Sequence, residues 1–70
     1  MKAISYKIEF HPQDTDLLEE QWFNSVDTAW AAFRLFAEPD SLEMYSRVEL
    51  TKVDFAQHRE RLMAALEFHP

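Results

Sequence analysis

The first ten residues alternate between apolar and polar side chains. Apolar side chains stand at Ile4, Tyr6, Ile8 and Phe10, and polar ones at the positions between them. Because successive side chains of a strand point to opposite faces, this period of two predicts a half-buried β-strand over residues 2–10. Residues 11–15 include a proline and an aspartate, which favour a turn at the end of that strand.

Residues 16–24 fit two interpretations. As a helix, they would open a stripe that continues to residue 36, with Asp16 and Glu19 forming a capping box. As a strand, they would place Leu18, Glu20 and Trp22 on one face. The strand is favoured because Asn24–Ser25 is a poor helix interior but a good start signal. A two-stranded sheet built only from the remaining strands would also be only marginally stable. We therefore predict a hairpin.

The next segment has the spacing of a helix. Apolar residues recur three or four positions apart, at Val26, Ala29/Trp30, Phe33 and Phe36/Ala37. Ser25 stands where an N-cap residue is expected. Pro39 predicts the end of the helix, since the residue before a proline is disfavoured in the helical region.

The last third of the chain is interpreted as a strand followed by a second helix. The strand covers residues 45–53, with Val48 and Leu50 facing the core. Asp54 and Gln57 have the spacing of a capping box, which predicts a helix after the strand. The apolar stripe of that helix would contain Phe55, the stem of Arg59, Leu62 and Leu66, with Met63 and Ala65 beside it. The prediction is a single α+β domain over residues 1–70, ordered β-β-α-β-α. Its mainly antiparallel three-stranded sheet would carry two helices on one face.

The aromatic content predicts a protein partner. The chain is 47% hydrophobic, which argues against disorder despite a net charge of −6, and its ten aromatic residues exceed what so small a core holds easily. In a strand, Trp22 and Phe23 point to opposite faces, so one of them would lie outside the core. We predict that Trp22 or Phe23, together with Tyr45, forms the contact surface of a non-catalytic, homodimeric interaction module. The alternative is a wide core that partly covers the outer ring.

Negative charge is concentrated in the first two-thirds of the chain. Nine acidic residues between Glu9 and Glu43 accompany one base, Arg34. Direct nucleic-acid binding is disfavoured, because it needs clustered cations. A second hypothesis is that an acidic patch mimics nucleic-acid phosphates and binds a basic nucleic-acid-handling protein, as small phage or mobile-element accessory proteins could do. The patch would comprise Asp14, Asp16, Glu19, Glu20, Asp27, Glu38 and Asp40. The plainer alternative is that the charge maintains solubility.

Motifs for catalysis or for binding a cofactor are missing from the sequence. The chain contains no cysteine and no glycine, and glycine is the usual residue of phosphate cradles and nucleophile elbows. Its three histidines lack the spacing of a metal site, and only His11, His69 and Asp14 could meet as ligands. We therefore predict no catalytic residue, no metal and no cofactor, and keep a small enzyme or metal protein as the least favoured hypothesis.

The same features predict a cytoplasmic protein. A chain without cysteine suits a reducing compartment. Met1–Lys2 leads directly into the alternating segment, so we expect no secretory leader. Membrane binding is not expected either, because no stretch approaches the roughly 20 apolar residues that span a bilayer.

Overall fold

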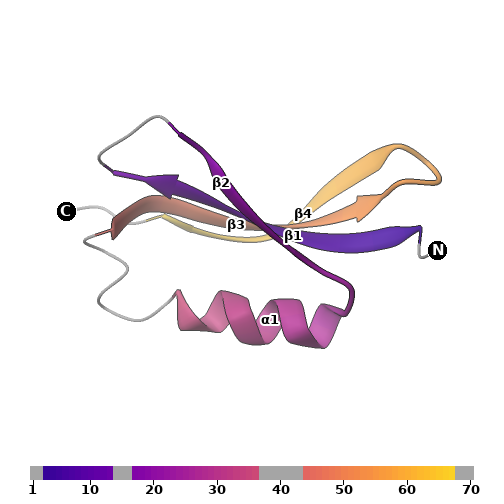
Figure 1. The fold of residues 1–70 in the computed structure, drawn as a ribbon, viewed down its shortest axis with the longest axis horizontal. Coiled ribbons are helices and arrows are strands. Elements are labelled where there is room, and N and C mark those ends of the chain that lie inside the picture. Colours follow the sequence, from indigo (N-terminus) through magenta and orange to yellow (C-terminus); the bar gives the residue numbers. More distant parts are fainter. Residues whose placement is uncertain (1–2, 14–16, 37–43, 68–70) are drawn as a thin grey trace.

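In the computed structural model, the described residues form one antiparallel sheet of four strands with a single helix against it (Figure 1). The structure describes residues 3–13, 17–36 and 44–67. The elements in chain order are β1 (Ile4–Pro12), β2 (Glu19–Phe23), α1 (Val26–Leu35), β3 (Tyr45–Asp54) and β4 (Arg59–Glu67). The strands lie in the order β2-β1-β3-β4. No helix among the described residues is long and apolar enough to cross a membrane.

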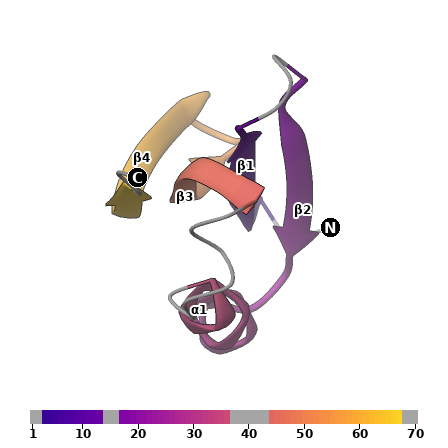
Figure 2. The same cartoon turned by 90° about the vertical axis from the view of Figure 1, so that its left-hand side faces the viewer.

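The core lies between α1 and the two central strands. Strand register places Ile8 opposite Leu50 and Phe10 opposite Val48. Ile8 and Phe10 therefore share the core face, as the period of two in β1 predicts. Figure 2 shows α1 on one side of the sheet only, where it packs mainly against β1 and β2. The buried residues of this cluster are Ile8, Phe10, Ala29, Phe33, Val48 and Leu50.

Four predicted elements are confirmed. The first and third strands are present, residues 19–23 form a strand rather than a helix, and the helix begins at Val26. Ser25 has the extended backbone of an N-cap residue, and its carbonyl oxygen accepts a hydrogen bond from the Ala29 amide at 3.0 Å. Its hydroxyl makes no capping hydrogen bond, so the predicted side-chain cap is wrong. The helix ends at Leu35, before Pro39.

The predicted three-stranded sheet with two helices is wrong, because the second helix is a fourth strand. Residues 55–58 form a turn, and β4 then pairs with β3 in antiparallel register. The order is therefore β-β-α-β-β. In β4, Ala64 and Leu66 lie opposite the buried Leu50 and Val48, so one edge of the core is completed by a strand.

Two local features explain why β4 resembled a helix in the sequence. The Asp54 Oδ1 atom accepts a hydrogen bond from the Gln57 amide at 3.1 Å, so the predicted capping interaction exists but closes a hairpin turn. His58 ends that turn with a φ of 53°, a region where glycine is usual. The register then shifts between Leu50 and Thr51, which leaves Met63 as the extra residue of a β-bulge. The bulge interrupts the alternation that would have marked a strand.

The sheet face opposite α1, called the open face below, is covered by no element of the described chain (Figure 2). Residues opposite one another in antiparallel strands share a face, so the register defines its members. They include Ser5, Lys7, Glu9 and His11 of β1, Glu20 and Trp22 of β2, Arg47, Glu49, Thr51 and Val53 of β3, and Glu60 and Glu67 of β4.

Candidate functional site on the open sheet face

An aromatic pair occupies one end of the open face. The ring centroids of Trp22, from β2, and Phe55, from the turn after β3, lie 5.9 Å apart with planes inclined by 28°. These two side chains remain 49% and 51% exposed, respectively. The neighbouring Phe23 points to the other face and packs against the core. Stacking alone therefore leaves half of each outer ring in water.

Lys7 lies beside the aromatic pair and is the centre of an ion-pair network. Its Nζ atom is 5.7 Å from the centre of the Trp22 ring, within the range of a cation–π interaction. The same atom lies 2.7 Å from a carboxylate oxygen of Glu60, 2.7 Å from one of Glu9 and 3.9 Å from one of Glu20. Hydrogen bonds to Glu60 and then Glu9 raise the pKa of Lys7 above its ordinary value, against the opposing effect of burial. Lys7 therefore stays charged throughout the neutral range.

Three glutamates lie opposite one another across three strands. The register pairs Glu20 of β2 with Glu9 of β1, and Glu9 with Glu49 of β3. This line of carboxylates is called the glutamate row below. Like charges in directly opposed positions destabilise a sheet unless cations lie beside them. Lys7 and Arg47, one on each side of the row, contact its members.

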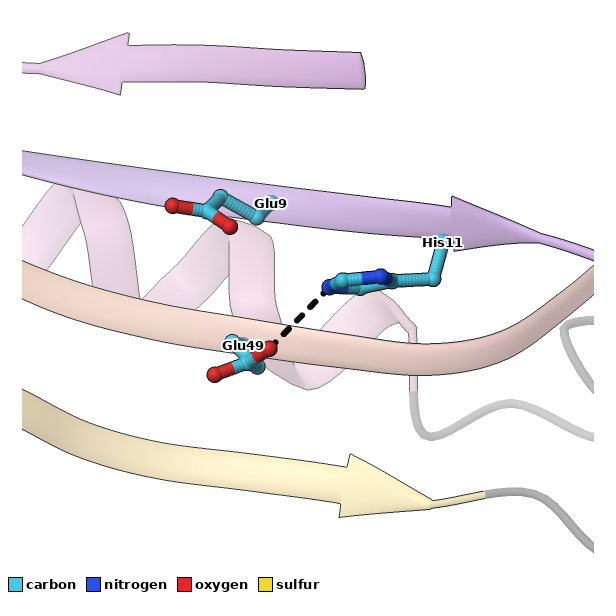
Figure 3. A group of neighbouring side chains, drawn as sticks. All are labelled: Glu9, His11 and Glu49. Atoms are coloured by element: carbon cyan, nitrogen blue, oxygen red, sulfur yellow. Dashed lines mark hydrogen bonds and ion pairs between the residues drawn. The ribbon is translucent and has the colours of Figure 1, made fainter. Parts of the chain in front are cut away.

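A histidine and an arginine close the far end of the open face. The His11 Nε2 atom lies 3.0 Å from Oε1 of Glu49, and Figure 3 shows the imidazole directed at that carboxylate. The same oxygen lies 3.0 Å from Nε of Arg47, which also pairs with Glu67. One potential ligand atom from each of Glu9, His11 and Glu49 falls within 4.8 Å of the other two.

The open face carries excess negative charge in its middle. Two cations, Lys7 and Arg47, neutralise part of the charge of five glutamates, so the net charge of these residues is −3 when His11 is neutral. Lys7 is shared among Glu60, Glu9 and Glu20, and Arg47 is shared between Glu67 and Glu49. Neither cation fully neutralises the glutamates that it contacts, and three of the five glutamates form the glutamate row. The five glutamates are Glu9, Glu20, Glu49, Glu60 and Glu67.

The structure separates the three aromatic residues predicted to form an interface. Trp22 is on the open face and half exposed, whereas Phe23 and Tyr45 pack against the core. The Tyr45 ring lies 5.5 Å from that of Phe10 and 5.9 Å from that of Phe36. A contact role for these residues remains a prediction. Phe55, which the sequence assigned to a helix stripe, is the partner that Trp22 meets.

The predicted acidic patch is described only in part. Asp14, Asp16, Glu38 and Asp40 lie outside the described residues. Glu20 belongs to the glutamate row, Glu19 lies on the opposite face of β2, and Asp27 lies in the first turn of α1. Glu9 and Glu49, which the structure places beside Glu20, were not part of the predicted patch, because their proximity depends on which strands pair.

The group of metal ligands considered in the sequence, His11, His69 and Asp14, differs from the group that the structure brings together. Asp14 and His69 lie outside the described residues, so the grouping with His11 is not described. His11 instead meets Glu9 and Glu49. A signal did exist in the sequence: Glu9 and His11 are two residues apart in a strand and so share a face. The third member could be found only from the pairing of β1 with β3.

Both edges of the sheet are poorly suited to pairing with another strand. The edge strand β2 has only five residues and includes Glu19 and Glu20. The other edge strand, β4, contains a bulge and carries Arg59, Glu60 and Arg61 at one end. Short strands, charges and bulges are the features by which sheets avoid edge-to-edge association. Contacts with another chain are therefore favoured at the face.

Comparison of the chain with protein-family models, curated proteins and solved structures finds no match. The functional argument therefore rests on the geometry and charge of the open face.

Proposed function

We propose that this protein is a non-catalytic protein–protein interaction module that forms a homodimer through the aromatic end of its open face. The observation that carries the proposal is the stacked Trp22–Phe55 pair, each ring half exposed on a sheet face that α1 does not cover. Tryptophan is a preferred anchor of interfaces, and burial of exposed rings drives association. A cysteine-free chain of this kind suits the cytoplasm.

Charge supports a second copy as the occupant of this end. The side chain that underlies Trp22 is Lys7, whose charge is compensated by Glu60 and Glu9, each at 2.7 Å. A two-fold axis near the aromatic pair would bring the rings of two copies together. The glutamate row, which lies two residues along the strands from Trp22 and Lys7, would then be displaced from the axis in each copy, which limits repulsion between the two rows. The blunted sheet edges also favour contact through the face.

The proposal is tested by the mass of the protein in solution. Sedimentation equilibrium of the full chain should give a dimer at high micromolar concentration that dissociates on dilution. Trp22→Ser should be monomeric at the same concentrations with an unchanged circular dichroism spectrum. The matched control is Leu35→Ser on α1, which removes a side chain that is 67% exposed and should leave the dimer intact. A wild-type protein that is monomeric throughout would refute the proposal.

A second candidate function is favoured by the glutamate row. Its incompletely neutralised carboxylates would attract a basic nucleic-acid-binding protein. The row would then occupy the site where that protein binds nucleic-acid phosphates. In that case, a bound basic protein should be released by rising salt, and added nucleic acid should displace it. The double variant Glu9→Gln/Glu49→Gln should lose the interaction while Trp22→Ser retains it. Binding that is insensitive to salt would exclude this candidate.

A further inference from the structure

We propose that Glu9, His11 and Glu49 form a binding site for a divalent transition-metal ion such as Zn²⁺. A nitrogen or oxygen atom from each side chain lies within 4.8 Å of the other two (Figure 3). The His11 Nε2 and Glu49 Oε1 atoms are 3.0 Å apart. Two ligands of a tetrahedral zinc ion are separated by about 3.4 Å, given bonds of about 2.1 Å. The limit of 4.8 Å is wider than this separation, so binding requires the Glu9 carboxylate to turn from Lys7 toward the ion.

The donor set selects the class of metal. An imidazole nitrogen with carboxylate oxygens suits zinc and neighbouring transition metals, whereas Ca²⁺ and Mg²⁺ prefer oxygen ligands alone. Three protein ligands leave a fourth position for water, as in sites that are open to solvent. All three side chains are half-buried on a face without a covering element, so water can reach that position.

The scaffold holds the three ligands without a loop. Glu9 and His11 are two residues apart on β1, and Glu49 lies directly opposite Glu9 on β3. These are the two central strands, and their other faces carry the most buried residues of the core. Sites on such strands are held more accurately than sites on loops.

The charge on the open face supports a bound cation. Lys7 is shared among Glu9, Glu20 and Glu60, so it cannot fully neutralise any one of them. Arg47 is likewise shared between Glu49 and Glu67, so a divalent ion between Glu9 and Glu49 would add positive charge that these two cations do not supply. Such an ion is commonly the largest charge in its surroundings.

Isothermal titration calorimetry of the chelator-washed full chain with ZnCl₂ tests the site. We expect one ion per chain, and no binding heat with CaCl₂ or MgCl₂. His11→Gln and Glu49→Gln should each weaken zinc binding by more than about 100-fold, since even substitutions outside the ligand shell cost about 10- to 100-fold. The matched control is His58→Gln in the exposed β3–β4 turn, which should leave the affinity unchanged. Absence of binding heat, or binding that survives His11→Gln, would overturn the site.

A second variant separates metal binding from a general effect of charge. Arg47 contacts the same Glu49 oxygen that would bind the metal, at 3.0 Å from its Nε atom. Arg47→Gln should therefore tighten zinc binding severalfold by releasing that carboxylate, and unchanged or weaker binding would contradict the site. The proposal does not depend on dimerisation, so the Trp22→Ser chain should bind zinc with the affinity of the wild type.

Discussion

Replacing Lys7 with methionine removes the cation that organises the aromatic end of the open face. The lysine side chain is only 12% exposed, and its Nζ atom contacts Glu9 and Glu60 at 2.7 Å. Methionine keeps an apolar side chain of similar length against Trp22, so the change removes mainly charge. The expected result is a folded but less stable protein.

The magnitude follows from the contacts that are lost. A cation–π interaction at a partly exposed site contributes about 0.5–1 kcal/mol. Each exposed ion pair contributes about 0.2–1 kcal/mol, and the values for Glu60 and Glu20 lie at the low end because their side chains are 58% and 43% exposed. The substitution also leaves these carboxylates to repel Glu9. We expect Lys7→Met to lower the free energy of unfolding by about 1–2.5 kcal/mol, the sum of these contributions.

Urea denaturation followed by tryptophan fluorescence measures this loss. The difference between wild type and Lys7→Met should shrink at molar salt, because repulsion among the remaining carboxylates is then screened. Since the pKa of Lys7 is raised in the folded state, its stabilisation is complete below the unfolded pKa of about 10.5 and is lost gradually as pH rises from there toward the higher folded pKa. The difference should therefore also shrink in strongly alkaline solution.

The matched control for this experiment is Lys52→Met. Lys52 lies on β3 and faces the side of α1, opposite Tyr6, and it forms no ion pair with any described residue. Its substitution should change the free energy of unfolding by less than about 0.5 kcal/mol. The assigned role of Lys7 would be refuted if the two variants were equally stable, or if the cost of Lys7→Met did not depend on salt.

Three further substitutions test the fold. Leu50→Ala, at a position with 0% exposure, should cost about 2–5 kcal/mol and shift the urea midpoint strongly; a cost below about 1 kcal/mol would contradict its place in the core. Asp54→Ala removes the acceptor for the Gln57 amide and should cost about 0.5–1.5 kcal/mol in thermal unfolding, with faster hydrogen exchange in the β3–β4 turn; unchanged exchange there would count against that bond. His58→Gly should stabilise the protein by about 0.5 kcal/mol, because relief of the positive φ outweighs the entropy of glycine, and a destabilised variant would contradict the turn geometry.

The elements that the sequence predicts well are those with an uninterrupted pattern or a clear boundary signal. Ile4 to Phe10 alternate without exception, and the structure has a strand there whose buried residues are Ile8 and Phe10. The strand at Glu19–Phe23 could be chosen over a helix because Asn24–Ser25 favours a break. In both cases, the local pattern of side chains indicates the same secondary structure that the tertiary packing requires.

The fourth strand could not be recognised from local pattern alone. Asp54 and Gln57 have the spacing of a helix start, and their hydrogen bond satisfies a hairpin turn equally well. The extra residue at the Met63 bulge interrupts the alternation of a strand, while Phe55, Leu62 and Leu66 keep the spacing of a helix face. A strand is distinguished from a helix here only by the pairing of this segment with the outer edge of β3. That pairing is a tertiary contact, which the local sequence does not show.

The candidate site was predictable in one respect and not in another. Opposite orientations of Trp22 and Phe23 follow from the strand itself, so an exposed ring was expected, although its partner Phe55 was not. The glutamate row joins residues up to 40 positions apart, from Glu9 to Glu49. Their proximity follows from the order β2-β1-β3, which no pattern within a single strand encodes.

The most direct test of the proposed interface is the fluorescence of Trp22 on dilution. Trp30→Phe leaves Trp22 as the only tryptophan of the chain. If two copies associate through this ring, its emission should move to longer wavelength, and its quenching by acrylamide should increase, as the protein is diluted from high to low micromolar concentration. Emission and quenching that do not change with concentration, in a protein that remains folded, would contradict the interface.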